Sequence, residues 1–157
     1  MNRRAFVTGL GVVLAAPLVA GAQQAPKAPR IGVLHPGAPA AASQLVAAFK
    51  QGLREHGYVE GQNIVVEPRF AEARAERLSD IAAELVRLKV DVIVTASDVG
   101  IAAVKQQTET IPIVMANSTD PVGTGFVASL ARPGGNVTGL SNISPALSEG
   151  ARSRTSA

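Results

Sequence analysis

The sequence has 157 residues, no cysteine, and fifteen Lys or Arg residues against twelve Asp or Glu residues. Without the four arginines and one glutamate of the two end segments, the chain has eleven basic and eleven acidic residues. Only 3% of its residues are aromatic. This composition excludes an extended basic, aromatic-rich surface for binding nucleic acid. Since no disulfide can form, packing of a core must stabilise the fold, which predicts a domain of ordinary size.

Residues 1–22 have the pattern of a secretory signal peptide. Two arginines near the start precede an apolar run over residues 7–19, which ends in the small-residue cleavage pattern Ala-Gly-Ala. The run is too short and too rich in glycine for a membrane-spanning helix, although a retained anchor is the alternative interpretation. The paired arginines are also typical of a twin-arginine signal. We therefore expect export to a bacterial periplasm, followed by a Pro/Ala linker over residues 23–29.

Short apolar runs alternate with amphipathic segments along the rest of the chain. Leu45, Val46, Phe49 and Leu53 recur at helical spacing, and Gly57 is placed as the stop of that helix. In chain order, the pattern predicts a strand at 30–34, a helix at 40–57, a strand at 64–70, a helix at 73–90, a strand at 90–97, a helix at 98–108, a strand at 111–116, a short helix at 125–130 and a strand at 137–141.

This order predicts an α/β fold, an open parallel sheet with helices on both faces and right-handed crossovers, as in a Rossmann-like lobe. The strand at 90–97 is almost continuously apolar over residues 92–94, which is typical of a strand covered on both faces. Asp98 follows this strand directly and is the expected N-cap of the next helix.

Polar residues follow four of the predicted strands. In an open parallel sheet the carboxyl ends of the strands meet at one edge, where helices begin and free backbone N–H groups suit a small ligand with a carboxylate. Any single Ser, Thr, Asn or Asp is as readily explained as a helix cap or a turn, so only the convergence of several ends favours a binding site. The four ends are His35-Pro36-Gly37, Thr95-Ala96-Ser97-Asp98, Asn117-Ser118-Thr119-Asp120 and Ser141-Asn142.

Catalytic and cofactor patterns are poor. His35 and His56 are the two histidines, and Ser97 lacks the Gly-x-Ser-x-Gly surroundings of a nucleophile elbow. The sequence has no metal-ligand spacing, no Gly-x-Gly-x-x-Gly after the first strand and no phosphate-binding loop. We therefore predict a protein that is not an enzyme and uses no cofactor or metal. The alternatives are an exported α/β hydrolase that uses Ser97 or Asp120 and a sensor module of the same fold.

Three segments carry a resemblance to a known family: "GYVEGQN", "IPIV" followed by "DPV", and "SLARPGGNVTG". With these segments, residues 1 to about 148 resemble the ABC-transporter substrate-binding proteins of the tryptophan/tyrosine-import type, which have the type I periplasmic-binding-protein fold. The resemblance implies two lobes that close on a small organic solute such as an aromatic amino acid, and a membrane permease and an ATPase as partners. The ligand-binding positions that it implies in the first lobe are His35, Pro36, Thr95, Ala96, Ser97, Asn117, Ser118 and Asp120.

The end of the chain differs from this family. Residues 149–157, "EGARSRTSA", have no apolar period and are expected to be a disordered tail outside the family pattern. Residues 30–148 are then expected to form an N-terminal lobe of a truncated protein. Because affinity in a two-lobe receptor comes from burying the solute between the lobes, the lone lobe should bind weakly.

Overall fold

The computed structural model describes residues 27–142. The expected signal peptide at 1–22, the tail at 149–157 and the last residues of the expected lobe therefore lie outside the described residues. None of the helices within 27–142 combines the length and apolarity that crossing a membrane requires. In chain order the elements are β1 (Arg30–His35), α1 (Pro39–Glu55), β2 (Val65–Phe70), α2 (Ala75–Arg87), β3 (Val92–Thr95), α3 (Asp98–Lys105), β4 (Ile113–Met115) and β5 (Val137–Gly139).

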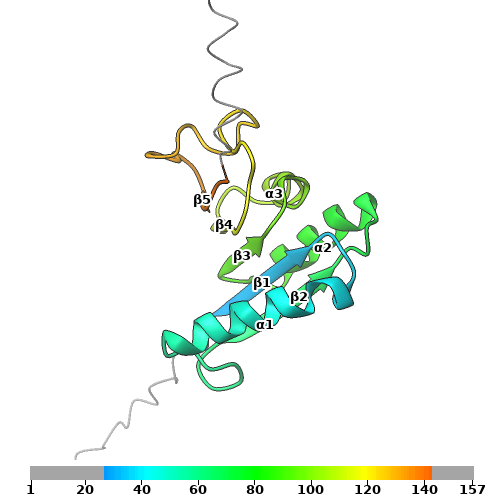
Figure 1. Cartoon of the computed structure of the whole chain (residues 1–157), viewed down its shortest axis with the longest axis vertical. Helices are drawn as coiled ribbons and strands as arrows, with labels where there is room; N and C mark the ends of the chain where they lie inside the picture. The colour runs from blue at the N-terminus through cyan, green and yellow to red at the C-terminus, as the bar shows by residue number, and fades with distance from the viewer. Residues whose placement is uncertain (1–26, 143–157) are drawn as a thin grey trace, which may run out of the picture.

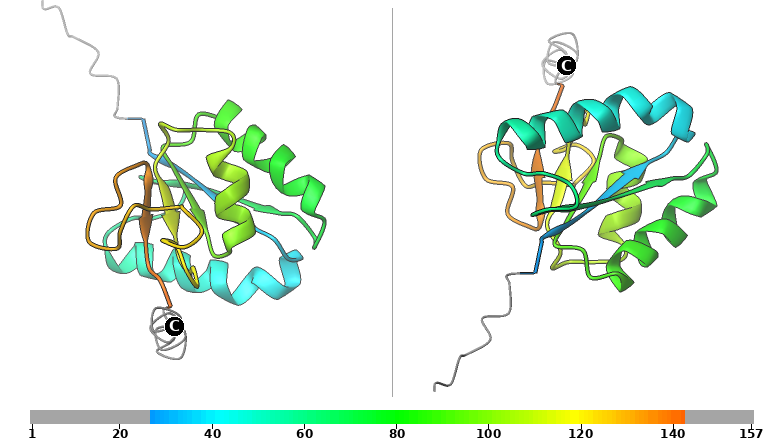
Figure 2. Two further views of the ribbon diagram at one scale, coloured as in Figure 1. Left: turned by 90° about the horizontal axis from the view of Figure 1, so that it is seen from above. Right: turned by 90° about the horizontal axis from the view of Figure 1, so that it is seen from below.

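The five strands form one parallel sheet in the order β2-β1-β3-β4-β5 (Figure 1). The helix α1 lies on one face, and α2 and α3 lie on the other (Figure 2). This arrangement follows from the handedness of crossovers. The step from β1 to β2 runs toward one edge of the sheet, and the later steps run toward the other edge, so right-handed connections place their helices on opposite faces. The predicted fold class is confirmed.

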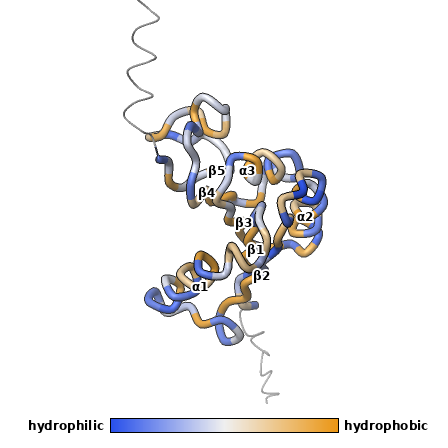
Figure 3. The backbone as a smooth tube through the Cα atoms, turned by 45° about the vertical axis from the view of Figure 1, so that its right-hand side comes forward, coloured by the Kyte–Doolittle hydropathy of each residue, from blue (hydrophilic) through white to orange (hydrophobic). Residues whose placement is uncertain are grey.

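The core lies between the sheet and the pair α2 and α3. The predicted apolar face of α2 is buried there through Leu78, Ile81 and Leu85, and in Figure 3 this helix alternates hydrophobic and hydrophilic stretches as an amphipathic helix should. By contrast, α1 contributes one fully buried residue, Ala42. The two faces of the sheet are therefore covered to very different extents.

Gly57 ends α1 as predicted. It has a φ of +84°, which glycine adopts without the strain that a side chain would add. The N–H of Tyr58 donates to the carbonyl of Leu53 at 2.9 Å, and the N–H of Gly57 donates to the carbonyl of Arg54 at 3.0 Å. This pair of bonds is the Schellman motif, which satisfies two of the carbonyls left open at the end of the helix.

The predicted N-cap of α3 was wrong by one residue. Ser97 is the cap: its backbone is extended, and its Oγ accepts the N–H of Gly100 at 3.1 Å. Asp98 is the first residue of the helix. Its carboxylate is consequently not used as a cap and bonds to residues beyond the next strand.

The predicted helix at 125–130 was also wrong, because these residues form turns and bends. The carboxylate of Asp120 accepts the N–H of Gly123 at 2.8 Å, and Gly125 has a φ of +72°, outside the right-handed helical region. The side chain of Lys105 then donates to the carbonyls of Gly125 and Phe126, both at 3.2 Å. Since these carbonyls are bonded to a side chain, a continuing helix is not needed to satisfy them.

Candidate functional site

The predicted strand ends do meet at one edge of the sheet. Leu34 is in register with Thr95, and Thr95 is in register with Met115, so β1, β3 and β4 end at the same level. Within the predicted ligand-binding set, His35 and Thr95 are the last residues of β1 and β3, and the other six residues lie in or just after the turns that follow β1, β3 and β4. The structure therefore brings together His35, Pro36, Thr95, Ala96, Ser97, Asn117, Ser118 and Asp120 along a common rim.

A hydrogen-bonded group lies at the centre of this rim. The hydroxyl of Ser118 donates to one carboxylate oxygen of Asp98 at 2.6 Å, and the hydroxyl of Thr119 donates to the other at 2.9 Å. Ser118 is only 2% exposed, and its carbonyl accepts the N–H of Asn142 at 2.8 Å. This rim cluster, Asp98, Ser118 and Thr119, ties the ends of β3, β4 and β5 together. Charge-assisted bonds of this kind are among the stronger hydrogen bonds in proteins.

Sequence reasoning left Asp98 and Thr119 out of the predicted set. Asp98 was assigned to a cap because it follows a strand, and its true partners lie 20 and 21 residues further along the chain. The polar run after β4 is the signal that could have identified Asp98 and Thr119. It supplies hydroxyl donors next to an acidic residue that follows β3, the neighbouring parallel strand.

Two predicted site residues have local structural roles. Ser97 caps α3, and Asp120 caps the turn at Gly123. Both roles are those expected of Ser and Asp at such positions whatever the protein binds. Asn117 and Ala96 are exposed on the rim.

His35 ends β1 and is held by its own loop. Its Nδ1 accepts the N–H of Gly37 at 3.0 Å, which places the proton of the neutral ring on Nε2. The ring lies 6.4 Å from the ring of Phe70, centre to centre, at an interplanar angle of 55°. The imidazole is therefore fixed in orientation, with its Nε2–H as the group left to donate.

The next residue, Pro36, is bound to a strained turn after β2. Its carbonyl accepts the N–H of Ala73 at 2.8 Å, and Glu72 and Ala73 both have positive φ values, 55° and 61°. Non-glycine residues in this region persist only where their surroundings hold them. Hydrogen bonds from Arg77 and Arg74 hold the pKa of Glu72 below its usual range. The turn after β2 therefore holds the loop after β1 in place through the hydrogen bond between Ala73 and Pro36.

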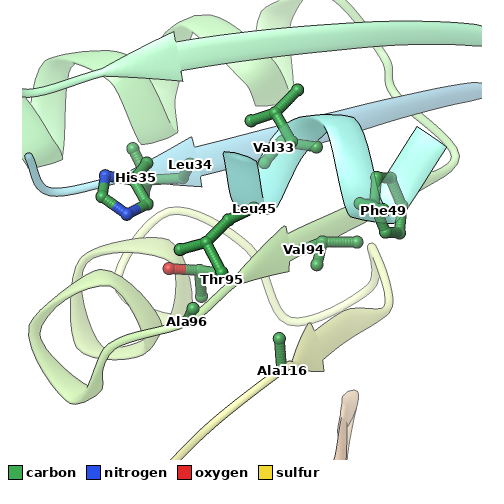
Figure 4. Close-up of a pocket in the computed structure, with 10 residues that line it drawn as sticks. Val33, Leu34, His35, Leu45, Phe49, Val94, Thr95, Ala96 and Ala116 are labelled. Atoms are coloured by element: carbon green, nitrogen blue, oxygen red, sulfur yellow. The ribbon is translucent and has the colours of Figure 1, made fainter. Parts of the chain in front are cut away.

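An apolar groove of about 130 Å³ lies beside the rim, between α1 and the sheet (Figure 4). Ligand sites usually combine apolar walls with a few polar groups that orient the ligand. His35 is at the end of this groove, but the hydroxyl of Thr95 lies against Gly100 on the side of α3. Apart from the imidazole of His35, the groove therefore has few polar groups that could orient a solute, and the rim cluster is the better candidate site. The groove is lined by Val33, Leu34, His35, Leu45, Val46, Phe49, Val94, Thr95, Ala96 and Ala116.

The hydroxyl of Thr95 gives a prediction about stability. The residue is 1% exposed, and within residues 27–142 its Oγ1 has no hydrogen-bond partner. An unsatisfied buried hydroxyl is costly, so Thr95→Val should leave the free energy of unfolding unchanged or raise it by about 1 kcal/mol. Thr95→Ser keeps the hydroxyl and removes the methyl group, and should lower it by about 1 kcal/mol. Urea denaturation measures both, and a clear loss of stability in Thr95→Val would contradict this account.

Comparison with known proteins places the fold among solute receptors. The family described as "ABC transporter substrate binding protein" matches residues 30–149. The tyrosine-binding protein of Clostridioides difficile is 38% identical over 94 residues, which cover 60% of this chain and 27% of that protein.

Three solved structures are similar to this chain. A conserved domain protein from Vibrio cholerae has a TM-score of 0.71 and 32% identity, and the match covers 82% of this chain and 43% of that one. An ABC domain in complex with L-Trp from Streptococcus pneumoniae has a TM-score of 0.69 and 29% identity, covering 76% and 40%. A ligand-free, open substrate-binding protein with adhesive properties from Clostridium difficile has a TM-score of 0.68 and 28% identity, covering 74% and 39%. The chain thus spans less than half the length of each relative.

Proposed function

Because the chain belongs to the ABC transporter substrate-binding protein family, we propose that it is a periplasmic solute-binding component of an ABC importer. In this proposal residues 1–22 direct export, with paired arginines typical of the twin-arginine route, and residues 30–148 form the N-terminal lobe. A permease and an ATPase in the membrane are the partners. The protein has no catalytic role, and a hydrolase or sensor module of the same fold is the alternative.

The solute that we propose is a small organic molecule, an amino acid with an aromatic side chain. The observation that carries this proposal is the rim cluster, in which two hydroxyl groups hold the carboxylate of Asp98 at the first residue of α3. A fixed carboxylate attracts an ammonium group, and the start of a helix attracts a carboxylate. A zwitterionic amino acid offers both groups. Tyrosine and L-Trp appear in the names of two relatives, which supports this choice of class.

A single lobe should hold such a solute weakly. Two-lobe receptors gain affinity by enclosing the ligand on both sides, and this chain spans 39% to 43% of its solved relatives. We expect a dissociation constant of about 1 mM or weaker for L-Trp, L-Tyr or L-Phe with this chain alone, equivalent to roughly 4 kcal/mol or less.

NMR titration of the isotope-labelled chain with L-Trp tests this proposal. The expected result is a set of saturable shifts at the backbone amides of residues 96–98 and 117–119, which weaken in Asp98→Asn. Asp80→Asn, an exposed change on α2, is the matched control and should bind as the native chain does. Absence of shifts at 10 mM solute, or shifts confined to other residues, would overturn the proposed site. Tight stoichiometric binding would overturn the weak-binding half of the proposal.

A further inference from the structure

Two apolar hollows adjoin the rim of the sheet, one on each face. The groove of Figure 4 lies between α1 and the sheet. The second hollow, of about 150 Å³, lies on the face that α2 and α3 cover (Figure 2), at the starts of these two helices. We call it the α2–α3 hollow, and it is lined by Pro36, Ala73, Arg74, Ala75, Leu78 and Val99. Of these residues, only Pro36 belongs to the predicted ligand-binding set.

The α2–α3 hollow is next to the carboxylate of the rim cluster. Val99 lines the hollow, and the residue before it, Asp98, carries the carboxylate that the two hydroxyl groups hold. Both residues belong to the first turn of α3. The groove of Figure 4 reaches the rim at Ala96 and lies on the opposite face of the sheet from α3. A solute whose ammonium group binds Asp98 can therefore place its side chain in the α2–α3 hollow without passing over the end of β3.

The walls of the α2–α3 hollow are mostly apolar and are tied to each other. Leu78 is buried beneath it, whereas Val99 is 58% exposed and offers apolar surface to a ligand. The carbonyl of Pro36 accepts the N–H of Ala73 at 2.8 Å, which joins the wall after β1 to the wall after β2. An apolar cavity of roughly 150 Å³ accommodates a benzene ring. The hollow therefore has room for one aromatic ring.

Arg74 adds a charged group to this apolar lining. Its guanidinium bonds to the carboxylate of Glu72 at 3.0 Å, and Arg77 bonds to the same carboxylate at 2.8 Å. The contact with Glu72 limits the orientations of the guanidinium at the edge of the hollow. A guanidinium plane stacks on the face of an aromatic ring, an attraction that a saturated ring of similar size does not provide. Arg74 therefore gives the hollow a means of selecting an aromatic side chain over an aliphatic one.

We propose that the α2–α3 hollow receives the aromatic side chain of the solute, with the ring between Val99 and the guanidinium of Arg74. This inference rests on the proposed function, in which Asp98 binds the ammonium group of the same solute. It adds Arg74 and Val99 as specificity-determining residues, neither of which was in the predicted set. The head group and the ring then occupy adjoining parts of the rim, and Leu78 forms the floor beneath the ring.

NMR of the methyl-labelled full chain tests where the side chain lies, with L-Phe and L-Ala as solutes that share the same head group. L-Phe should shift the methyl resonances of Val99 and Leu78 through its ring current, and L-Ala should not. Methyl shifts at Leu45 and Val46 instead would assign the ring to the groove and overturn the inference, while amide shifts at residues 96–98 would leave the proposed function standing. Shifts at Val99 without shifts at residues 96–98 would do the reverse, and no shifts at all would overturn both.

Arg74→Gln tests the role of the guanidinium. It should weaken the binding of L-Phe roughly two- to fivefold, the strength of an exposed cation–π contact, and should leave the binding of L-cyclohexylalanine unchanged because its ring is saturated. Arg87→Gln, which removes an exposed charge in the last turn of α2, is the matched control and should bind both solutes as the native chain does. Equal effects of Arg74→Gln on the two solutes would contradict the contact. The side chain of Arg74 is 56% exposed, so the fold should survive, which circular dichroism checks.

Discussion

Replacing Leu85 by alanine is expected to lower the free energy of unfolding by about 3–5 kcal/mol, the largest single effect on stability that we predict. The side chain is fully buried at the centre of the core and lies directly over the backbone of β1. A Cβ atom built on Gly32 would come within 2.9 Å of it, so helix and strand are as close as their atoms allow. Loss of this side chain leaves a cavity that neither element can close by moving nearer.

Leu130→Ala is the matched control for this change, because it makes the same chemical substitution at a residue that is 50% exposed. It should cost less than about 1 kcal/mol, since little apolar surface leaves the interior. Urea denaturation with a common m-value compares the two variants directly. Equal losses would mean that the core does not lie between the sheet and α2, contrary to the fold described here.

The parts of the fold that could be predicted from sequence are those specified by local pattern. The apolar run that contains Val92, Ile93 and Val94 gave the position of β3, and the spacing of Leu78, Ile81 and Leu85 gave α2 and its buried face. Gly57 gave the end of α1, because a positive φ is a local requirement. In each case the signal lies within a few residues of the structure that it predicts.

The parts that could not be predicted depend on residues far apart in the chain. Lys105 reaches the carbonyls of Gly125 and Phe126 across 20 and 21 residues, and this contact replaces the expected helix at 125–130. Likewise, the helical spacing of Leu45 and Phe49 predicted an apolar face for α1. It did not indicate that the face would be half-open, because the cover depends on the direction of every crossover in the sheet.

The candidate site was predictable in part from local sequence pattern and depends in part on contacts between distant residues. The convergence of His35, Thr95 and the segment after β4 on one edge followed from the parallel order of strands, and the structure confirms that convergence. The assignment of individual residues as ligand contacts stays a prediction. The rim cluster was not foreseen, because an acidic residue after a strand fits a cap equally well until the tertiary partner is known.

The second large effect concerns Asp98. Asp98→Ala removes the acceptor for two hydroxyl groups, one of which belongs to Ser118, a buried residue. A buried hydroxyl bonded to a charged acceptor contributes about 1.5–3 kcal/mol, and an unpaired one is costly, so Asp98→Ala should lower the free energy of unfolding by about 2–3 kcal/mol. Asp98→Asn keeps an acceptor oxygen without the charge and should cost about 1 kcal/mol.

A double-mutant cycle separates this pairing from other effects of the substitution. In urea denaturation, Asp98→Ala and Ser118→Ala should show a coupling energy of about 1.5–3 kcal/mol, whereas Asp98→Ala with Thr119→Val should couple by less than about 1 kcal/mol, because Thr119 is exposed. Strict additivity for Asp98 and Ser118 would contradict the rim cluster. If coupling is found and Asp98→Asn loses the L-Trp shifts while staying folded, then the carboxylate that joins the strand ends also contacts the solute. If coupling is found and the shifts persist, Asp98 only positions the loops, and the ammonium group must be recognised elsewhere on the rim.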